Sequence, residues 1–343
     1  MVGGPGVRRD SIMIAASKLS EEMLESMFIP DHPFRGMQSD FCFWIDTLKR
    51  VKTLIVNADD FGLTPGVNRA IVELARQGCV TSATLMARAS ATDEAIALAM
   101  HTPELGVGCH IVLVDGQSSL PVEARPLPWL IDPATGEFWP TLGRFLRALY
   151  ASGAARSARD EAIEAEAFAQ IRGLQSSGLR LTHIDTHKHT HMFPAVLRPV
   201  LRAARRAGVR RVRNPFEPEW SARATPGAAW LRRAQVRVLR QFRAAFYRIV
   251  AEEGFVTTAG SIGVLATGTL DRSTVAALLG ALPNDVWELV THPGYHDSAL
   301  AEVRTRLLAS REVEIDALGL VATLSSIERI RFDALINTEN SRR

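Results

Sequence analysis

Short apolar segments of strand character alternate with helical segments between residues 51 and 310. Residues 53–58 are typical of a buried parallel strand, and residues 67–77 predict a helix that ends before Gly78. A β-branched strand pattern follows over residues 81–86. We predict further helices over 93–100, 161–174, 194–207, 231–250 and 303–310, and further strands over 106–114, 181–185, 209–213 and 286–291. This alternation predicts an α/β fold, with a parallel sheet wrapped by helices.

The same pattern predicts one catalytic domain with two flanking segments. A chain of 343 residues is compatible with a single α/β barrel. Residues 1–50 lack strand alternation and contain helix-breaking prolines, so we expect an N-terminal extension there. We assign residues 51–310 to the catalytic domain and residues 311–343 to a partly helical C-terminal segment.

Composition excludes several classes of protein. Hydrophobic residues make up 47% of the chain, which excludes wholesale disorder. No run approaches the roughly 18–20 apolar residues of a membrane span, and the N-terminus does not resemble a secretory signal. The 3 cysteines are scattered and odd in number, which excludes a disulfide framework. We therefore expect a soluble, cytoplasmic protein.

Positive charge gathers in one region of the chain. The net charge is +3, and arginines are concentrated between residues 198 and 248. They indicate either nucleic-acid binding or solvated helix faces, and we favour the second because no nucleic-acid module accompanies them. Within this region we predict a long amphipathic helix with Leu231, Val238, Phe242 and Ile249 on its apolar face.

Several predicted strands end in polar residues that can bind metals. Asp59 and Asp60 close the first strand, and His110 lies in the third. A histidine-rich run from His183 to His191 follows a later strand, and His292 ends the last one. The carboxyl ends of parallel strands form the active-site edge in α/β barrels and open α/β sheets, so this recurrence indicates an enzyme.

Asp59 and Asp60 are candidates for two different roles. Successive side chains of an extended chain point to opposite faces. One carboxylate can therefore bind a cation while the other acts as a base on bound water. The alternative is a pair of residues that caps the following helix.

The run from His183 to His191 is the most specific local signal. One aspartate and four histidines fall at every second position, namely His183, Asp185, His187, His189 and His191. In a fully extended chain all five would share one face, although a helix predicted near residue 194 leaves the last two free to line a cleft. An aspartate and two histidines suit a catalytic divalent ion with open positions. The alternative is a nonspecific histidine-rich tract.

Three further polar residues have competing interpretations. His110 is either a metal ligand or a hydrogen-bonded core histidine. His292 is the best candidate for a general acid, since imidazole titrates near neutrality, and its alternative is a loop histidine. Arg213 follows a predicted strand, where it could bind substrate, orient Asp59 or form a structural salt bridge.

Four motifs together resemble the YdjC/ChbG-like carbohydrate deacetylases. They are Leu54–Gly62 with its Asp59-Asp60 pair, the Gly108–His110 strand, His183–Pro194, and Thr291–Tyr295. The resemblance covers residues 51 to about 308. It implies a distorted TIM-like (β/α) barrel and metal-dependent removal of an acetyl group from an N-acetylated amino sugar.

The resemblance also assigns roles to residues. Asp60, His110 and His187 match the metal ligands of the family, with Mg²⁺ or Zn²⁺ as the divalent ion. Asp59 matches the catalytic base, and His292 the expected acid. Lys188 replaces the middle histidine of the family's motif at a position that is not a ligand. We assign six further polar residues to substrate binding, namely His183, Asp185, His189, His191, Arg213 and Tyr295.

A finer resemblance is to the hopanoid-biosynthesis-associated branch, HpnK. It rests on a loop that includes residues 113–117, 120–121, 131–132 and 136–138. It implies an N-acetylglucosaminyl hopanoid lipid as substrate and peripheral contact with the inner membrane face. The exposed surface for such contact would come from tryptophans near arginines, for which the candidates are Trp129, Trp139, Trp220 and Trp230.

Rival functions remain open at this point. A deacetylase of soluble chito-oligosaccharides would keep the chemistry and change the substrate. A phosphoesterase could use the same metal on the same scaffold. A non-catalytic metal-binding or nucleic-acid-associated protein would not depend on the Asp59 carboxylate. A homodimer is one option for the assembly.

Overall fold

A computed structural model of the chain describes residues 52–121, 129–151 and 155–335. Contacts within the chain separate residues 1–50 from residues 51–343, and every described residue belongs to the second unit. The expected N-terminal extension over 1–50 therefore lies outside the described residues. Among the described residues, no helix is both long enough and apolar enough to span a membrane.

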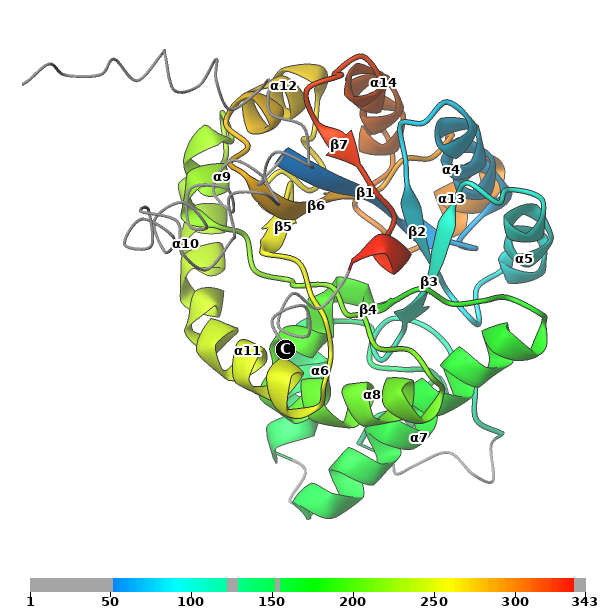
Figure 1. Cartoon of the computed structure of the whole chain (residues 1–343). Helices are drawn as coiled ribbons and strands as arrows, with labels where there is room; N and C mark the ends of the chain where they lie inside the picture. Colours follow the sequence, from blue (N-terminus) through cyan, green and yellow to red (C-terminus); the bar gives the residue numbers. More distant parts are fainter. Residues whose placement is uncertain (1–51, 122–128, 152–154, 336–343) are drawn as a thin grey trace, which may run out of the picture. The chain divides into compact units, whose positions relative to one another are not determined.

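The described part of the chain is an α/β unit in which helices surround a curled sheet of parallel strands (Figure 1). The strands are β1 (Lys52–Phe61), β2 (Ser82–Leu85), β3 (Gly106–Ile111), β4 (Ile184–Thr186), β5 (Gly260–Ile262), β6 (Asp285–Thr291) and β7 (Glu328–Arg329). The α-helices are α4 (Pro65–Arg76), α5 (Thr92–Met100), α6 (Leu142–Ala151), α7 (Arg156–Ser176), α8 (Pro194–Arg206), α9 (Glu219–Ala224), α10 (Trp230–Leu239), α11 (Arg243–Glu252), α12 (Arg272–Gly280), α13 (Ser298–Glu302) and α14 (Ser310–Ala322). Three 3₁₀ segments complete the elements: η2 (His187–Met192), η3 (Arg240–Phe242) and η4 (Phe332–Ala334).

The sheet order is β4-β3-β2-β1-β6-β5, and β7 pairs with the start of β1. All these pairings are parallel. Beyond β4, the segment around residues 211–212 makes isolated parallel bridges to Ile184 and Val256. The fold is therefore a curled parallel sheet with helices around it. The resemblance implies a distorted TIM-like (β/α) barrel, but strand pairing among the described residues does not close the sheet into a barrel.

The two faces of the central strand differ in chemistry. Leu54, Val56 and Ala58 of β1 are fully buried in the main apolar core. Asn57 and Asp59 point to the other face, where polar side chains from neighbouring strands surround them. The alternation of the strand thus separates a helix-packed apolar layer from a polar interior.

Local signals explain several element boundaries. Thr64 caps α4 by accepting a hydrogen bond from the Val67 amide at 3.3 Å, and Pro65 occupies the first turn. Gly78, with a φ of +70°, follows the end of α4 in the left-handed region. These features match the helix predicted over residues 67–77 to within a few residues.

Two predicted elements need correction. Residues 209–213 form only single bridges instead of a regular strand. The helix predicted over 303–310 is absent because Asp297 caps an earlier helix, α13, and the next helix, α14, begins at Ser310. The domain boundary expected after residue 310 stays a prediction, and β7 of the expected C-terminal segment pairs with β1.

The predicted helix over 231–250 consists of α10, η3 and α11 in succession. The prediction of one buried apolar face along this helix is correct only for its second half. Ile249 is buried, whereas Leu231 and Val238 are 56% and 61% exposed. The first half of this apolar stripe therefore faces outward.

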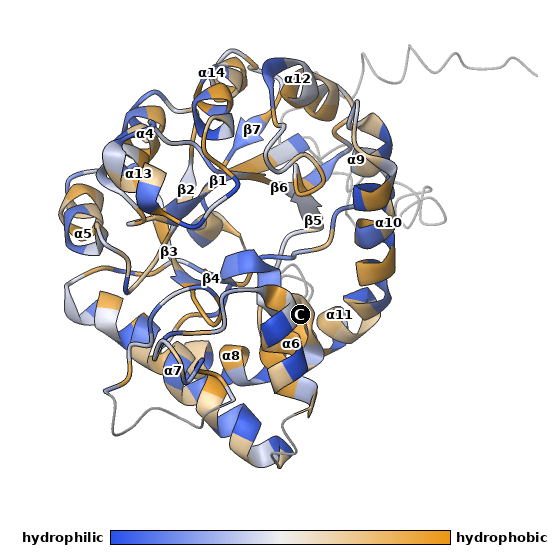
Figure 2. Cartoon of the chain, turned by 180° about the vertical axis from the view of Figure 1, so that it is seen from behind, coloured by the Kyte–Doolittle hydropathy of each residue, from blue (hydrophilic) through white to orange (hydrophobic). Residues whose placement is uncertain are grey.

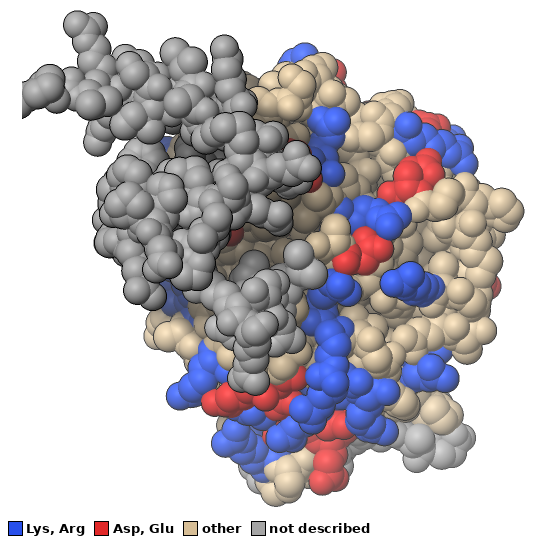
Figure 3. All heavy atoms as spheres, viewed as in Figure 1, with Lys and Arg blue, Asp and Glu red and all other residues tan. Residues whose placement is uncertain are grey.

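Arginines of the basic region are largely paired on helix surfaces. Arg198 contacts Glu252 and Glu253, and Arg206 contacts Glu164 of α7. Figure 3 shows blue and red side chains interspersed over the lower part of the visible face, where α7, α8 and α11 lie in Figure 1. This arrangement is typical of solvated, salt-bridged helix faces.

Candidate active site

Three donor atoms from three separate segments converge beyond the carboxyl ends of the strands. Asp60 Oδ1 lies 3.6 Å from His110 Nε2 and 3.5 Å from His187 Nδ1. The two imidazole nitrogens are 3.2 Å apart. Asp60 and His110 are buried and His187 is half-buried, so His187 is the most exposed member of this donor group.

An unusual backbone conformation directs Asp60 into this group. The pairing of β1 with β2 shifts register between Ala58 and Phe61, and Asp60 has a φ of 66°. A positive φ is uncommon for a residue other than glycine. This local turn separates the carboxylates of Asp59 and Asp60. One can then bind a cation while the other acts as a base.

His110 is held in one tautomer by its neighbours. Its Nδ1 lies 2.8 Å from Asp185 Oδ1, and this buried carboxylate favours a proton on Nδ1. Nε2 then has its lone pair directed at the donor group. Burial lowers the pKa of His110, but the adjacent Asp185 carboxylate outweighs burial and raises it to about 9. In the absence of a metal, the His110 imidazole would therefore carry a second proton, on Nε2, at neutral pH.

The donor group fits a divalent metal ion. Ligands that bind zinc at 2.0–2.1 Å in a tetrahedral arrangement lie about 3.3 Å from one another, close to the separations of 3.2 to 3.6 Å found here. A second cluster of Asp59, His110 and Asp185 also lies within ligand distance. This second cluster suits a metal less well because both of its carboxylates, those of Asp59 and Asp185, already form ion pairs with Arg213.

Asp59 lies beside the metal-type cluster but has different partners. The Arg213 guanidinium donates to both Asp59 carboxylate oxygens, at 2.7 and 2.6 Å. Burial opposes ionisation of Asp59, yet Arg213 outweighs burial and holds the pKa of this carboxyl well below its usual range. Asp59 is therefore ionised and fixed in orientation.

Arg213 is the centre of a buried ionic network. It also contacts Asp185, and its Nε donates to Glu288 Oε1 at 2.6 Å. Its side chain has no solvent exposure and contacts buried carboxylates, and substrate binding by Arg213 stays a prediction. The structure favours another of its interpretations, because Arg213 orients Asp59.

His292 is close enough to Asp59 to exchange a proton through a small movement. Its Nε2 lies 3.8 Å from Asp59 Oδ2, and 12% of the side chain is exposed. Its backbone amide donates to Glu314 Oε2 of α14 at 2.5 Å. Burial lowers the pKa of His292 to about 4, against the opposing effect of Asp59, so the resting imidazole is neutral at pH 7.

The every-second-residue pattern of the histidine run ends at Thr186. β4 stops there, and Lys188 and His189 adopt left-handed φ values of 54° and 52° within η2. His187 alone among the run's histidines joins the donor group. His189 is half-buried, and its Nδ1 has no hydrogen-bond partner among the described residues, so its role in substrate binding stays a prediction.

Three residues of the run are fully buried and bonded to neighbouring groups of the chain. His183 is fully buried, stacks on Phe332 at 3.8 Å between ring centroids, and hydrogen-bonds Asn57. His191 is fully buried between Thr186 Oγ1 and the Arg213 carbonyl. Asp185 is fully buried against His110 and Arg213. Because these side chains have no solvent exposure, the structure adds no support for substrate contact, which stays a prediction for all three.

Tyr295 is also engaged elsewhere. Its hydroxyl donates to Glu73 Oε2 on α4 at 2.5 Å, and Arg69 lies over its ring. This side chain ties the loop after β6 to α4. The prediction that it binds substrate is not supported by its contacts.

Two residues of α14 complete the site and were missed by the sequence analysis. Arg311 donates to Asp60 Oδ2 at 2.6 Å and to the His292 carbonyl at 3.4 Å. Glu314, also buried, accepts from the His292 amide. Burial raises the pKa of Asp60, but the adjacent Arg311 guanidinium outweighs burial and holds this pKa well below its usual range. No motif marks these residues, since Arg311 lies 251 positions from its partner Asp60.

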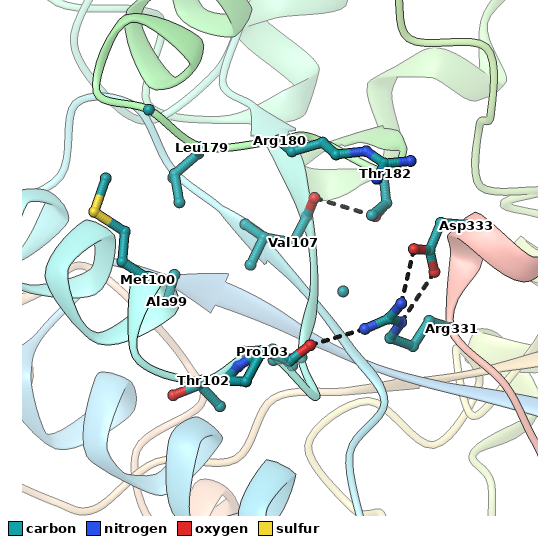
Figure 4. A pocket seen from close by; sticks show the side chains of 13 residues that line it. Ala99, Met100, Thr102, Pro103, Val107, Leu179, Arg180, Thr182, Arg331 and Asp333 are labelled. Carbon is teal, nitrogen blue, oxygen red and sulfur yellow. Dashed lines mark hydrogen bonds and ion pairs between the residues drawn. The ribbon is translucent and has the colours of Figure 1, made fainter.

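A separate pocket lies near the amino ends of β3 and β4 (Figure 4). Its lining includes Met100, Val107, Arg180 and Thr182, and Arg331 pairs there with Asp333. None of the donor residues lines it. This pocket is therefore distinct from the candidate active site.

Comparison with known proteins identifies the family to which the sequence is similar. The sequence pattern of the family described as "YdjC-like protein" matches residues 53–328. Two curated relatives are each named carbohydrate deacetylase. The protein from Brevibacillus brevis is 47% identical over 151 residues, which cover 44% of this chain and 55% of the relative. The protein from Geobacillus stearothermophilus is 43% identical over 172 residues, which cover 49% of this chain and 60% of the relative. The chain thus matches between 55% and 60% of the length of these relatives.

A solved structure supports the same fold. The protein from Enterococcus faecalis V583, named a cellobiose-phosphate cleavage protein, aligns with a TM-score of 0.64 at 24% identity. The alignment covers 83% of this chain and 98% of the other. At this level of identity the likeness establishes the α/β fold alone.

Proposed function

We propose that this chain, which belongs to the YdjC-like protein family, is a metal-dependent deacetylase that hydrolyses the acetamide of an N-acetylated amino sugar. The observation that carries the proposal is the juxtaposition of two groups. The donor group of Asp60, His110 and His187 lies beside an ionised Asp59 that is clamped by Arg213. The names of the two curated relatives favour carbohydrate deacetylation over other hydrolyses on such a site.

The residues of the chain divide the proton transfers between them. A divalent metal held by Asp60, His110 and His187 would polarise the acetamide carbonyl and lower the pKa of a bound water. Asp59 accepts the proton of the attacking water. Because its pKa is low, Asp59 favours passing this proton to His292, whose Nε2 is 3.8 Å away. His292 then donates the proton to the amine as the carbon–nitrogen bond breaks, and acetate is released.

The donor set also bears on the identity of the metal. Two imidazole nitrogens and one carboxylate oxygen suit zinc better than magnesium, which prefers oxygen ligands. We therefore expect Zn²⁺ to bind more tightly than Mg²⁺. Titration calorimetry of the metal-depleted protein with each ion measures this difference directly.

We keep the N-acetylglucosaminyl hopanoid as the proposed natural substrate, with soluble chito-oligosaccharides as the alternative. The support for the lipid is the resemblance of the loop over residues 113–138 to the HpnK branch. Of the tryptophans expected to face a membrane, Trp129 is buried, whereas Trp230 is 79% exposed. An inner-membrane location and a homodimer remain predictions.

The proposal is tested with a panel of substrates. Zinc-loaded protein is incubated with diacetylchitobiose, with an N-acetylglucosaminyl lipid in detergent and with a phosphate monoester. Acetate and phosphate release are measured. We expect acetate from an acetylated sugar, no phosphate, and loss of the reaction in His187→Ala. Phosphate release without acetate would instead assign the site to a phosphoesterase.

A further inference from the structure

Helix α10 presents an apolar stripe to the outside of the molecule. Trp230 is 79% exposed, Leu231 56% and Val238 61%, and Ala234 between them is also exposed. Positions 230, 234 and 238 are spaced by one helical turn, and 231 and 238 by two. No residue of α10 is buried. Figure 2 shows orange residues along α10 at the edge of the molecule, beside hydrophilic ones.

Positive charge flanks this stripe without compensating acids. Residues 220–251 contain seven arginines and neither aspartate nor glutamate. Arg232, Arg233 and Arg237 belong to α10, and among the described residues none of them has a carboxylate partner within ion-pair distance. Arg232 and Arg233 donate instead to backbone carbonyls, which leaves their charge in place.

The stripe lies on the same side of the sheet as the candidate active site. Arg232 near the start of α10 donates to the Val264 carbonyl at 3.2 Å. Val264 follows the carboxyl end of β5, and the donor group lies beyond the carboxyl ends of β1 and β3. Trp230 at the start of α10 is therefore placed at the end of the sheet that carries the candidate active site.

We propose that the exposed face of α10, formed by Trp230, Leu231, Ala234 and Val238 with Arg232 and Arg237, docks on an anionic membrane surface. Apolar side chains enter the interface of such a membrane while arginines contact its phosphates. This inference rests on the proposed function in one respect only. If the chain deacetylates an amino sugar, docking presents the site to sugars carried on membrane lipids.

Charge argues against two other occupants. In a two-fold contact between copies of this chain through α10, the arginines of one copy would face those of the other, and α10 has no acid to pair with them. Nucleic acid would use the arginines but gains little from a leucine and a valine between them. An anionic lipid surface satisfies both the charge and the apolar stripe.

Vesicle flotation tests the proposal with the full chain. Wild-type protein is mixed with vesicles of phosphatidylcholine alone and with vesicles that contain about 30% phosphatidylglycerol. We expect binding to the anionic vesicles that weakens in 0.5 M salt, as screening requires. Trp230→Ser/Leu231→Ser should bind about tenfold more weakly or worse, and Arg232→Gln/Arg237→Gln roughly fivefold more weakly for each arginine removed.

A matched control uses the opposite end of the sheet. Met100→Ser/Arg180→Gln also removes one exposed apolar side chain and one arginine, at the pocket of Figure 4, and should bind vesicles like wild type. Far-UV circular dichroism and zinc affinity verify that each variant is folded. Because zinc and vesicle binding are measured without substrate, failure of deacetylation leaves this test interpretable.

Three results would overturn the proposal. They are absence of binding to anionic vesicles, wild-type binding by Trp230→Ser/Leu231→Ser, and equal loss in the Met100/Arg180 control. A dimer by light scattering that becomes a monomer in Trp230→Ser/Leu231→Ser would assign the face to a second copy instead. Should the double variant fail to fold, Trp230→Ser and Arg232→Gln/Arg237→Gln still decide the question.

Discussion

At the scale of single residues, Asp59 and Asp60 are adjacent in sequence but differ in partner and in role. Arg213 clamps Asp59, whereas Asp60 faces two imidazole nitrogens. The left-handed φ of 66° at Asp60 separates them. The proposed metal-binding carboxylate, Asp60, and the proposed base, Asp59, can therefore be tested by independent substitutions.

Asp59→Asn should abolish turnover and leave metal binding intact. An amide cannot take the proton of the attacking water, and we expect turnover to fall by roughly 10²–10⁴-fold or more. Zinc affinity should stay within about twofold, since Asp59 is outside the donor group. Acetate release and calorimetric zinc titration measure the two effects. Deacetylation at the wild-type rate would remove Asp59 from the mechanism.

Asp185→Asn should weaken metal binding although Asp185 is not a ligand. The Asp185 carboxylate lies 2.8 Å from His110 Nδ1 and fixes the tautomer that exposes Nε2. Loss of a carboxylate behind a histidine ligand typically lowers metal affinity by about 10–100-fold. Zinc titration of this variant measures the change, and an unaltered dissociation constant would show that Asp185 does not orient His110.

The residues of the site were only partly predictable from sequence. Polar residues in or just after predicted strands indicated an active-site edge, and the family resemblance then matched Asp60, His110 and His187 to metal ligands. The burial of His183 and His191 could not be predicted, because an alternating pattern does not reveal where a strand stops. Glu288 and Arg311 carry no local signal, since their importance comes only from partners 75 and 251 positions away.

At the scale of elements, α14 connects a candidate metal ligand with the candidate acid. Arg311 binds Asp60 Oδ2 and the His292 carbonyl, and Glu314 binds the His292 amide. Both residues lie in the first turns of the helix, which packs against α4 and α12. α14 therefore fixes the orientation of two groups of the site from outside it.

Arg311→Met should reduce zinc affinity by about 10–100-fold, because Asp60 loses the partner that orients its second oxygen. Arg311→Lys should recover part of this loss by restoring the positive charge. Asp316→Asn, an exposed substitution on the same helix, is the control and should match wild type. If Arg311→Met is folded by circular dichroism and binds zinc like wild type, α14 does not position Asp60.

Element types were more predictable than element ends. The helices α4, α5, α7 and α8 and the strand β6 were predicted from apolar patterns and turn residues, whereas α6 was not predicted. The outward face of α10 was not predicted, because periodicity identifies an apolar stripe without showing what covers it. The loss of regular pairing at residues 211–212 depends on neighbouring strands that the local sequence does not specify.

At the scale of the whole molecule, the polar interior of the sheet makes folding sensitive to pH. Burial lowers the pKa of His183 to about 3, and burial raises the pKa of Glu314 to about 8. The stability that His183 contributes is lost as the pH falls, whereas the stability that Glu314 contributes is lost as the pH rises. Substitution of one group at a time is therefore needed to separate their contributions.

His183→Gln should make the protein less sensitive to acid. Unfolded His183 gains a proton below its ordinary pKa near 6.5, while the folded side chain stays neutral until about pH 3. The stability that His183 contributes is thus present above pH 6.5 and is lost as the pH falls towards 3. The advantage of wild type over the variant should shrink by up to about 1.4 kcal/mol per pH unit in this range. Urea unfolding at pH 7 and pH 5 measures it, with exposed His101→Gln as the control. A pH-independent difference would contradict the buried, neutral assignment.

The central claim is that a metal held by Asp60, His110 and His187 is required for deacetylation beside Asp59. The most direct measurement is acetate release from an N-acetylglucosaminyl substrate after removal of metal with EDTA and after zinc is restored. We predict no release from the metal-free protein, recovery with zinc in wild type, and no recovery in Asp59→Asn. Full acetate release from the metal-free protein would contradict the account.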